Sequence, residues 1–348
     1  MKLILATDAW TPQINGVVRT LMTTVDCLGR MGISCRVLHP GLFPSITYPF
    51  YRDIKLALPT RAKLRAWLGE ETPDRVHIAT EGPIGWTMRN WCIRKGWRFT
   101  TAFHTHFPQY LARFPGIPPF LTWCLLRWFH RPASGVMVAT KSLEKELVHQ
   151  RFDASKIRLW QRGVETDRFH PREKSPRGRP VALYVGRVST EKNIEAFLQV
   201  NRPVDKWIVG DGPDRASLQA RHPEARWLGW KQGEELSELY AQADVFVFPS
   251  KTDTFGLVML EAMASGVPVA AFPVEGPIDV VGPDSGVLDQ DLGRAIDGAL
   301  KCDPANCRRQ ALSWTWERCS SQFLSNLVPT RPALHIAPET TWPLPVSA

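Results

Sequence analysis

Residues 251–273 read KTDTFGLVMLEAMASGVPVAAFP, and they follow the apolar run DVFVFPS (244–250). A short apolar run rich in Val and Phe is typical of a buried strand in a parallel sheet. The letters LVMLEAMAS then predict a helix, which ends at the stop signals Gly266 and Pro268. The stretch therefore predicts a strand, the loop KTDTFG and a helix, which together form the repeating unit of an α/β sheet.

Two carboxylates interrupt this apolar stretch. Asp253 lies just before the predicted helix, and Glu261 lies in its second or third turn. The first N–H groups of a helix have no partners within it and carry the positive end of its dipole, so they can hold a phosphate. A buried carboxylate needs hydrogen-bond donors, and the vicinal hydroxyls of a ribose would supply two. On this segment alone an alternative is equally good, in which Asp253 only caps the helix and Glu261 pairs with a core arginine.

Strand-like and helix-like runs alternate on both sides of a basic linker over residues 170–180. This alternation predicts an α/β protein of two doubly wound, Rossmann-like domains that face each other across a ligand-binding cleft. The predicted strands are 3–7, 34–39, 75–80, 99–106, 135–140 and 156–160 in the first half, and 181–186, 206–210, 225–229, 244–250 and 267–273 in the second. The predicted helices follow residues 15–17, cover 84–95, follow Ser142 as N-cap, and cover 312–327.

The composition excludes several classes of protein. The 348 residues are 44% hydrophobic and 22% charged, as in soluble globular proteins, and no apolar run approaches the ~18–20 residues of a membrane span. The start of the chain is not expected to be a signal peptide, because Asp8 follows the first apolar run too soon. The seven cysteines show no metal-binding spacing, and reduced thiols in a cytosolic protein are the simplest interpretation.

The charge is distributed unevenly. Residues 1–170 carry 24 Lys and Arg against 12 Asp and Glu, whereas the remaining residues carry 19 against 22. The positive charge of the first half would attract either an anionic membrane or a nucleic acid. Three stretches there combine cations with Trp and other apolar residues, namely 60–71, 89–99 and 114–131. Each stretch alone fits core Trp and solvated Arg, but the basic half as a whole favours contact with a membrane surface.

Two cations, Arg187 and Lys192, follow the first strand of the second half in VALYVGRVSTEKN (181–193). At the carboxyl end of a strand and beside a helix N-terminus they suit a diphosphate, because charge-assisted hydrogen bonds to phosphate are strong. In KWIVGDGPDRASL (206–218), Gly210 and Gly212 would permit a close approach of the backbone. Each of these sequence patterns alone is weak evidence for a diphosphate-binding site. Their occurrence together, in this order along the chain, is much stronger evidence.

These segments resemble a known family. The order GRVSTEKN, WIVGDGP, WLGW, LYAQADVFVFPS and DTFGLVMLEAMASGVPV resembles the donor domain of the retaining glycosyltransferases of family 4, which have the GT-B fold. TPQINGVVRTL, AFHTHFPQYL and WQRGVETDRFHP are similar to the first loop, the histidine loop and the hinge-proximal motif of that family. The resemblance covers most of the chain. It is greatest to lipid-directed members, such as glycosyl-diacylglycerol synthases and phosphatidylinositol mannosyltransferases.

The resemblance implies roles for the matching residues. Arg187 and Lys192 would hold the donor's diphosphate, and Glu261 would hold its ribose hydroxyls. Asp253 would contact the donor sugar, and either His104 or His106 would face that sugar at the reaction centre. The other implied donor contacts are Gly16 near the diphosphate, Trp230 and Lys231 near the nucleobase, and the amides of Phe255, Gly256 and Leu257 at the sugar. Further donor-binding residues are Asn15, Gly186, Gly210, Asp211, Gly212 and Thr254.

Two departures from the family pattern are visible. The first acid of the family's E-x7-E signature is usually Glu, and Asp253 stands there with a shorter arm, which leaves the identity of the sugar open. Glu165 stands where many relatives carry Asp. The resemblance also implies the domain limits, with an acceptor-binding domain over 1–168 and a donor-binding domain over 169–311. A helix at about 312–328 would cross back to the first domain. The composition of residues 329–348, rich in Pro, Thr and Ala, predicts a flexible tail.

The implied reaction moves a sugar from a nucleoside diphosphate sugar to a hydroxyl acceptor with retention of the anomeric configuration, without a metal or another cofactor. We expect a UDP-sugar such as UDP-glucose or UDP-glucuronate, and a lipid acceptor such as diacylglycerol. The protein would then be cytoplasmic and would bind peripherally to the inner face of the cell membrane. The alternative is a GDP-mannose-dependent α-mannosyltransferase that acts on phosphatidylinositol or on a soluble or polysaccharide acceptor.

Three other classes of protein fit the sequence less well. A glycoside hydrolase needs two carboxyl groups roughly 5–9.5 Å apart, whereas a mostly helical path separates the backbones of Asp253 and Glu261 by about 12 Å. A dinucleotide-dependent dehydrogenase needs G-x-G-x-x-G after a strand, which neither GDGPDR nor GRVSTE provides. A nucleic-acid-binding protein would explain the basic half without any catalysis, and steep salt dependence would identify it.

Overall fold

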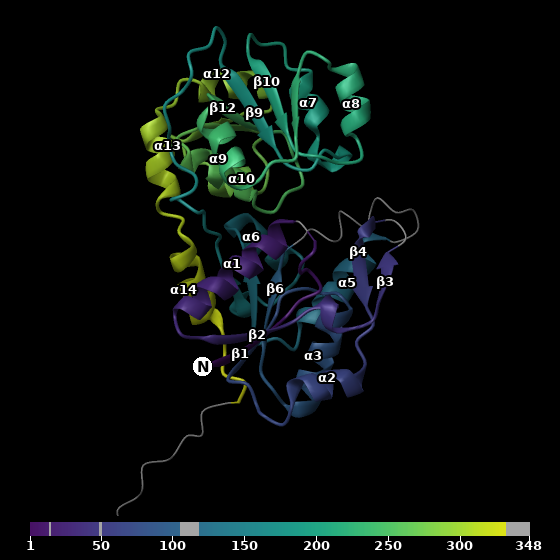
Figure 1. Cartoon of the computed structure of the whole chain (residues 1–348). Coiled ribbons are helices and arrows are strands. Elements are labelled where there is room, and N and C mark those ends of the chain that lie inside the picture. The colour runs from purple at the N-terminus through teal and green to yellow at the C-terminus, as the bar shows by residue number, and fades with distance from the viewer. Residues whose placement is uncertain (14, 49–50, 105–117, 332–348) are drawn as a thin grey trace, which may run out of the picture.

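The computed structural model describes residues 1–13, 15–48, 51–104 and 118–331, which form two lobes stacked one above the other (Figure 1). Each lobe is built on a six-stranded sheet, and the paired strands of both sheets run parallel. The predicted α/β class with two doubly wound units is thereby confirmed.

The strand order shows where ligands are expected. The first sheet has the order β2 (Ser34–Leu38), β1 (Lys2–Ala6), β5 (Arg75–Ile78), β6 (Thr100–Phe103), β7 (Gly135–Val138) and β8 (Ile157–Leu159). The second has the order β11 (Arg226–Gly229), β10 (Asp205–Val209), β9 (Val181–Val185), β12 (Val245–Phe248), β13 (Val269–Ala271) and β14 (Gly286–Leu288). The order reverses between β1 and β5 and between β9 and β12, and a crevice beyond the carboxyl ends of the strands is expected at such points.

All eleven predicted strands occur, although the predicted strand over 99–106 ends at Phe103. Among the residues that the structure describes, three further strands were not predicted. β14 is only three residues long and follows the turn-like letters VGPDS, and β3 (Ser45–Tyr48) and β4 (Tyr51–Ala57) form a separate antiparallel hairpin.

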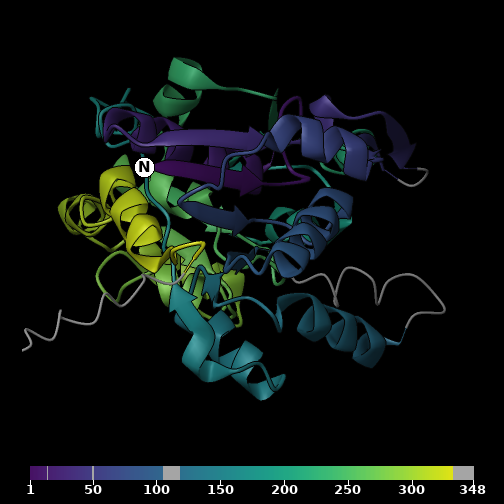
Figure 2. The same cartoon turned by 90° about the horizontal axis from the view of Figure 1, so that it is seen from below.

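The side chains of β1 point alternately to the two faces of the first sheet, as in any strand. Ile4 and Ala6 belong to the core cluster beneath α2 (Arg61–Leu68), α3 (Pro83–Lys95), α5 (Pro119–His130) and α6 (Lys141–His149). Leu3 and Leu5 belong to the cluster beneath α1 (Gly16–Arg30) and α14 (Trp316–Asn326). Figure 2 shows the two layers, with α14 in yellow on one side and α2, α3 and α5 in blue on the other. Both faces of this sheet are therefore covered.

The predicted helices are confirmed as α1, α3, α6, α10 (Leu257–Ala264) and α14, whereas α2 and α5 were not predicted as helices. The predicted N-cap of α6 was wrong. Thr140 caps it, because its hydroxyl accepts a hydrogen bond from the backbone N–H of Leu143 at 3.2 Å, so Ser142 lies inside the helix. The second lobe adds α7 (Ile194–Leu198), α8 (Arg215–Arg221), α9 (Gly233–Ala241), α10 (Leu257–Ala264), α11 (Pro277–Val280), α12 (Leu292–Ala299) and α13 (Pro304–Ala311).

The late helix crosses back to the first lobe. α13 packs against the second lobe, and α14 buries Trp316, Cys319 and Phe323 in the core of the first (Figure 1). The chain stays attached beyond α14, because the buried Thr330 donates from its N–H to the carbonyl of Asp74 at 2.9 Å. Residue 330 of the tail predicted over 329–348 is therefore attached to the first lobe, and residues 332–348 of that prediction lie outside the described residues. The other domain limits stay predictions.

The two crossings between the lobes run side by side. The N–H of Val164 donates to the carbonyl of Trp314 at 2.9 Å, and Val164 forms an isolated parallel bridge with Thr315. A Cβ atom added to Gly163 would lie 2.5 Å from the backbone nitrogen of Trp316. Only glycine fits this close contact between two backbones.

Gly163→Ala is therefore expected to lower the free energy of unfolding by about 1–3 kcal/mol, because the added methyl group overpacks the crossing. Urea denaturation measures the change. Gly178→Ala is the matched control, since a Cβ there meets no atom within 4 Å. Equal stability of the two variants would contradict the close contact.

Candidate active site

Glu261 lies at the centre of the contact between the two lobes. It occupies the second turn of α10 and is 2% exposed. Its carboxylate accepts one hydrogen bond from the Tyr240 hydroxyl on α9, at 2.8 Å, and another from the guanidinium of Arg19 on α1. The alternative that the sequence left open, a pairing of Glu261 with an arginine, is thus observed. The arginine comes from the other lobe rather than from the core around α10.

Arg19 connects three segments of the chain. It reaches from α1 of the first lobe to Glu261 of the second, and it also pairs with Glu165 at 3.3 Å in the segment between the lobes. The carboxylate of Glu261 raises the pKa of the Arg19 guanidinium, against the opposing effect of burial. Burial, followed by the charge of Glu261, raises the pKa of the Tyr240 hydroxyl well above its usual value. Arg19 therefore stays charged and Tyr240 stays a hydrogen-bond donor.

Lys192 and Asp253 face each other at the reversal point of the second sheet. Lys192 ends a short 3-10 turn (Thr190–Lys192) after β9, and Asp253 follows β12. The ammonium of Lys192 lies 2.6 Å from Oδ1 of Asp253. Asn193 holds this turn in place, because its side-chain amide donates to the carbonyl of Pro249 at 3.1 Å. The other carboxylate oxygen of Asp253 is buried and has no partner among the described residues.

The N-termini of α1 and α10 meet across the lobes. A Cβ atom on Gly16, the first residue of α1, would lie 3.9 Å from the side chain of Leu257, the first residue of α10. Asn15 caps α1 by accepting from the N–H groups of Val17 and Val18, both at 3.0 Å. Gly256 precedes α10 with a φ of 82°, a left-handed conformation that favours glycine. Two positive helix ends thus point into the same region.

His104 lies directly after β6 and is buried. The guanidinium of Arg162 donates to its Nδ1 at 3.1 Å, and the Thr254 hydroxyl of the second lobe donates to its carbonyl at 3.0 Å. Burial, with the nearby Arg162 cation, holds the pKa of His104 well below 6.5, so the ring is neutral. Because Nδ1 accepts, Nε2 carries the hydrogen, and this buried group has no acceptor among the described residues. His106, the other candidate, lies outside those residues.

The remaining predicted contacts comprise turn residues, exposed residues and the buried Phe255. A Cβ on Gly210 would lie 1.8 Å from the carbonyl of Gly186, so both belong to a tight approach of two loops. Asp211 accepts from the N–H of Gly212 at 2.8 Å and serves as a turn cap. Trp230 is 51% exposed after β11, and Lys231 beside it pairs with Glu235 at 3.4 Å. Arg187 follows β9, and its carbonyl accepts from the Tyr184 hydroxyl at 2.8 Å. Phe255 is buried against Trp314.

Asp253 also lines a cavity of about 390 Å³ on the second lobe. Its other walls come from Lys251 and Thr252 before Asp253, and from the segment 273–278 at the start of α11. A volume of this size lies within the range of ~300–1,000 Å³ that is usual for small-molecule sites.

Known proteins share this sequence pattern. Residues 14–168 match the family model described as Glycosyltransferase Family 4, and residues 179–300 match the model described as Glycosyl transferases group 1. A GDP-mannose-dependent alpha-mannosyltransferase of Mycobacterium tuberculosis is 32% identical over 313 residues, which cover 81% of this chain and 82% of the relative. The chain belongs to glycosyltransferase family 4.

This glycosyltransferase is also 27% identical, over 314 residues, to an Alpha-monoglucosyldiacylglycerol synthase of Streptococcus pneumoniae, with 78% of this chain and 71% of the relative covered. Among solved structures, the sucrose-phosphate synthase tll1590 of Thermosynechococcus elongatus has a TM-score of 0.74 at 22% identity, covering 93% of this chain and 97% of that one. This likeness confirms the GT-B fold. As a member of the family, the enzyme transfers a sugar from a nucleotide sugar.

Three residues of the candidate site were not predicted from the sequence. Arg19, Tyr240 and Arg162 support Glu261 and His104 from other segments, and Arg19 does so from the other lobe. No local pattern signals such contacts, because they depend on how the two lobes dock. The one available signal is position, since Arg19 lies in the first turn after the recognisable loop NGV.

Arg19→Met is expected to lower the free energy of unfolding by roughly 3 kcal/mol, because it leaves the buried carboxylate of Glu261 without its cation. Adding Glu261→Gln to Arg19→Met should restore part of the loss, and urea denaturation of the double-mutant cycle measures this coupling. Arg30→Met, an exposed position on the same helix, is the control and should leave the midpoint unchanged. Additive effects of Arg19→Met and Glu261→Gln would show that the two residues do not interact.

Proposed function

We propose that this glycosyltransferase acts with retention of the anomeric configuration and without a metal, and that its donor lies between the amino ends of α1 and α10. The observation that carries the proposal is the cluster around the start of α10. Lys192 and Asp253 are paired beside it, Glu261 lies further along the same helix, and His104 is joined to the same loop through Thr254.

The proposed mechanism assigns these groups by their chemistry. The diphosphate would accept hydrogen bonds from the first N–H groups of α10 and from Lys192 and Arg187, which stabilises the charge of the leaving group. The acceptor hydroxyl attacks on the face from which the diphosphate departs, and a phosphate oxygen takes its proton. His104 donates through Nε2 to a sugar hydroxyl, and Asp253 accepts from another.

The ribose would bind at Glu261. Arg19 and Tyr240 each use one of its two oxygens, and a carboxylate has about four acceptor positions, so two sugar hydroxyls can still be accommodated. The exposed ring of Trp230, after β11, offers a stacking surface for the base. A stacking surface does not distinguish uracil from guanine, so the base is chosen by groups other than this ring.

A UDP-sugar is our proposed donor, and GDP-mannose is the second candidate. The name of the M. tuberculosis relative favours GDP-mannose, whereas the name of the S. pneumoniae relative indicates a glucosyl product. The shorter Asp253 would leave space where the family's Glu contacts the sugar. Binding measurements are therefore needed to decide which of the two candidate donors the enzyme uses.

The proposed acceptor is a membrane lipid such as diacylglycerol, which the name of the S. pneumoniae relative supports. α5 carries an apolar outer face, because Phe120 and Trp128 are 63% and 58% exposed and Leu121 and Leu125 about half exposed. Such a face suits peripheral contact with a bilayer. In the part of the chain that the structure describes, no helix has the length and apolarity needed to cross a membrane.

The one Asp-x-Asp pair in the sequence is used for other contacts. Asp291 caps α12 by accepting from the N–H groups of Gly293 and Arg294, and Asp289 pairs with the side chain of Arg294 at 2.8 Å. Both acids therefore serve the start of α12, and we assign them no role in holding a metal–diphosphate complex.

The donor assignment is tested by calorimetric titration with UDP and with GDP, followed by turnover with a panel of sugar nucleotides with and without a chelator. We expect saturable binding of UDP, and we expect Lys192→Ala and Glu261→Ala to lower turnover by at least about a hundredfold, as when a preorganised contact is removed. Binding of GDP alone would select the second candidate. Turnover at wild-type rates in both variants would refute the site.

A further inference from the structure

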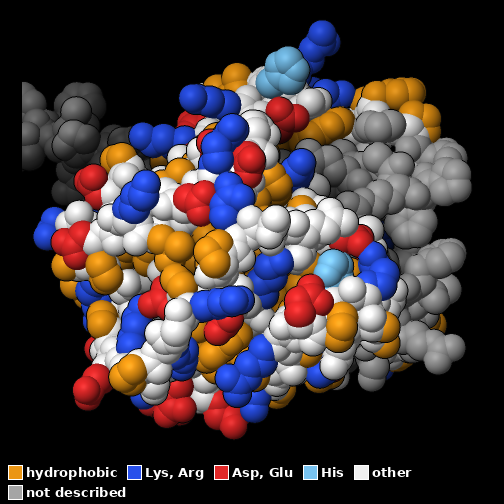
Figure 3. Space-filling view, turned by 90° about the horizontal axis from the view of Figure 1, so that it is seen from above, with side chains coloured by type: hydrophobic (Ala, Val, Ile, Leu, Met, Phe, Trp, Pro, Cys, Tyr) orange, Lys and Arg blue, Asp and Glu red, His pale blue; other side chains and the backbone are white. Residues whose placement is uncertain are grey.

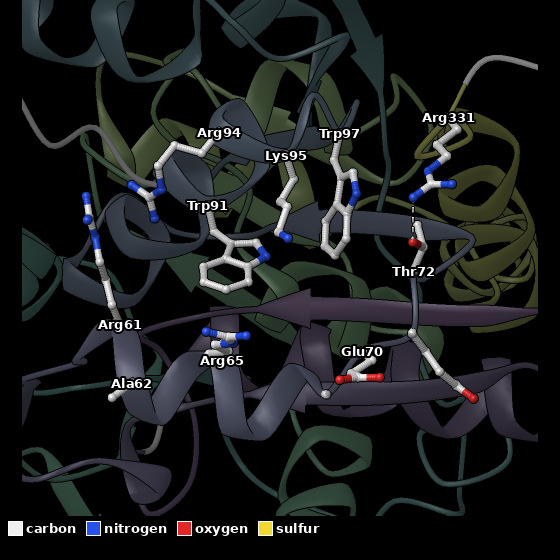
Figure 4. A pocket seen from close by; sticks show the side chains of 12 residues that line it. Arg61, Ala62, Arg65, Glu70, Thr72, Trp91, Arg94, Lys95, Trp97 and Arg331 are labelled. Carbon is white, nitrogen blue, oxygen red and sulfur yellow. Dashed lines mark hydrogen bonds between the residues drawn. The ribbon is translucent and has the colours of Figure 1, made fainter.

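A second cavity lies in the first lobe, away from the cleft. It has a volume of about 740 Å³ and lies between α2 and the last turn of α3 (Figure 4). α3 begins at the carboxyl edge of the sheet, where the N–H of Ile84 donates to Asp8, and it ends at Lys95 beside the cavity. A helix of this length spans about 20 Å, so the cavity lies at the other end of the lobe from the donor site.

The cavity joins two basic stretches that are separate in the sequence. Arg61 and Arg65 come from α2, within the stretch 60–71, and Arg94 and Lys95 come from α3, within the stretch 89–99. Figure 4 shows the side chains of the two helices pointing toward one another across the cavity. Arg331 adds a fifth cation from the far end of the described chain, where it donates to the Thr72 hydroxyl at 3.0 Å.

Among the residues that the structure describes, these cations lack the acidic partners that several cations of the second lobe have. In the second lobe, acidic and basic side chains alternate over the surface (Figure 3), and ion pairs such as Arg202–Asp297 and Arg221–Glu195 are frequent. Within the described ranges, no carboxylate pairs with the four cations of α2 and α3. Two acids do line the cavity, but Glu71 is already paired with Lys2. Among the residues that line the cavity, this leaves the single negative charge of Glu70 to balance the positive charges of five cations.

Two tryptophans complete the walls. Trp97 is buried, and Trp91 holds the cations in place, because Arg94 and Lys95 lie 5.9 and 5.6 Å from the centre of its ring. The Nε1–H of Trp91 is itself buried and has no acceptor among the described residues. The cavity therefore offers forked guanidinium donors and an ammonium, with few acceptors of the protein's own among the residues that line it.

We propose that this cavity binds a phosphate group, carried by a phosphate ester such as a phospholipid headgroup or a free phosphate. Guanidinium groups match phosphate oxygens bidentately, and a converging set of them selects phosphate over a single carboxylate. The α2–α3–α5 layer also presents the exposed apolar face of α5, so a headgroup in the cavity and acyl chains against α5 would use one side of the lobe. This site is separate from sugar transfer and does not depend on the donor's identity.

The test measures binding of three soluble probes by tryptophan fluorescence and calorimetry: inorganic phosphate, glycerol 3-phosphate and the short-chain lipid dihexanoylphosphatidylglycerol. Co-sedimentation with phosphatidylcholine vesicles, with and without phosphatidylglycerol, is the fourth arm. Arg65→Glu with Arg94→Glu should weaken binding of the preferred probe at least tenfold, as expected when charge-assisted hydrogen bonds are lost. Thermal midpoints, and the affinity for whichever of UDP and GDP the wild type binds, should stay as in the wild type, since neither residue lies near the cleft.

Lys63→Glu is the matched control, because Lys63 is exposed on the same helix but does not line the cavity. The proposal holds if this control binds as the wild type does while the cavity variant binds at least tenfold more weakly, and it fails if the cavity variant also binds as the wild type does. Tighter binding of the lipid than of glycerol 3-phosphate would identify a headgroup as the source, and equal binding would identify a soluble phosphate. The proposal is overturned if no probe saturates, or if Lys63→Glu weakens binding as much as the cavity variant, which would indicate a diffuse basic surface.

Discussion

A carboxylate buried in one lobe of this glycosyltransferase takes its cation from the other lobe. Glu261 sits on an almost entirely apolar helix, and without a charged partner its ionised form would be costly to bury. Arg19 supplies that partner and also contacts Glu165 in the segment between the lobes. The charge of one residue therefore constrains how the first lobe, the segment between the lobes and the second lobe lie together.

The same docking assembles the rest of the site. Gly16 reaches Leu257 only because α1 and α10 approach end to end, and Thr254 donates to the carbonyl of His104 across the same boundary. Each of these contacts joins a residue before 170 to one after 250. The preorganised donors and cations of the cleft are therefore a property of the two lobes together, and a change in their relative position would alter several of them at once.

Much of the fold could be predicted from the sequence, because parallel strands buried on both faces leave a continuous apolar signal. The short β14, the hairpin of β3 and β4 and the amphipathic helix α2 lack that signal. Within the site, the local motifs located Lys192, Asp253 and Glu261, but the partners Arg19, Tyr240 and Arg162 depend on docking and stayed hidden. The basic stretches 60–71 and 89–99 were visible as composition, yet their convergence on one cavity required the three-dimensional arrangement.

The central claim is that Glu261, held by Arg19, receives the ribose of the donor nucleotide. The most direct measurement compares the affinity of the nucleoside diphosphate that binds the wild type with that of its 2′,3′-dideoxy analogue, in the wild type and in Glu261→Gln. The account predicts that the wild type loses at least about tenfold in affinity for the analogue, since hydrogen bonds to a buried carboxylate are lost, and that Glu261→Gln discriminates far less. Equal discrimination by both proteins would contradict the account, because the ribose would then bind elsewhere.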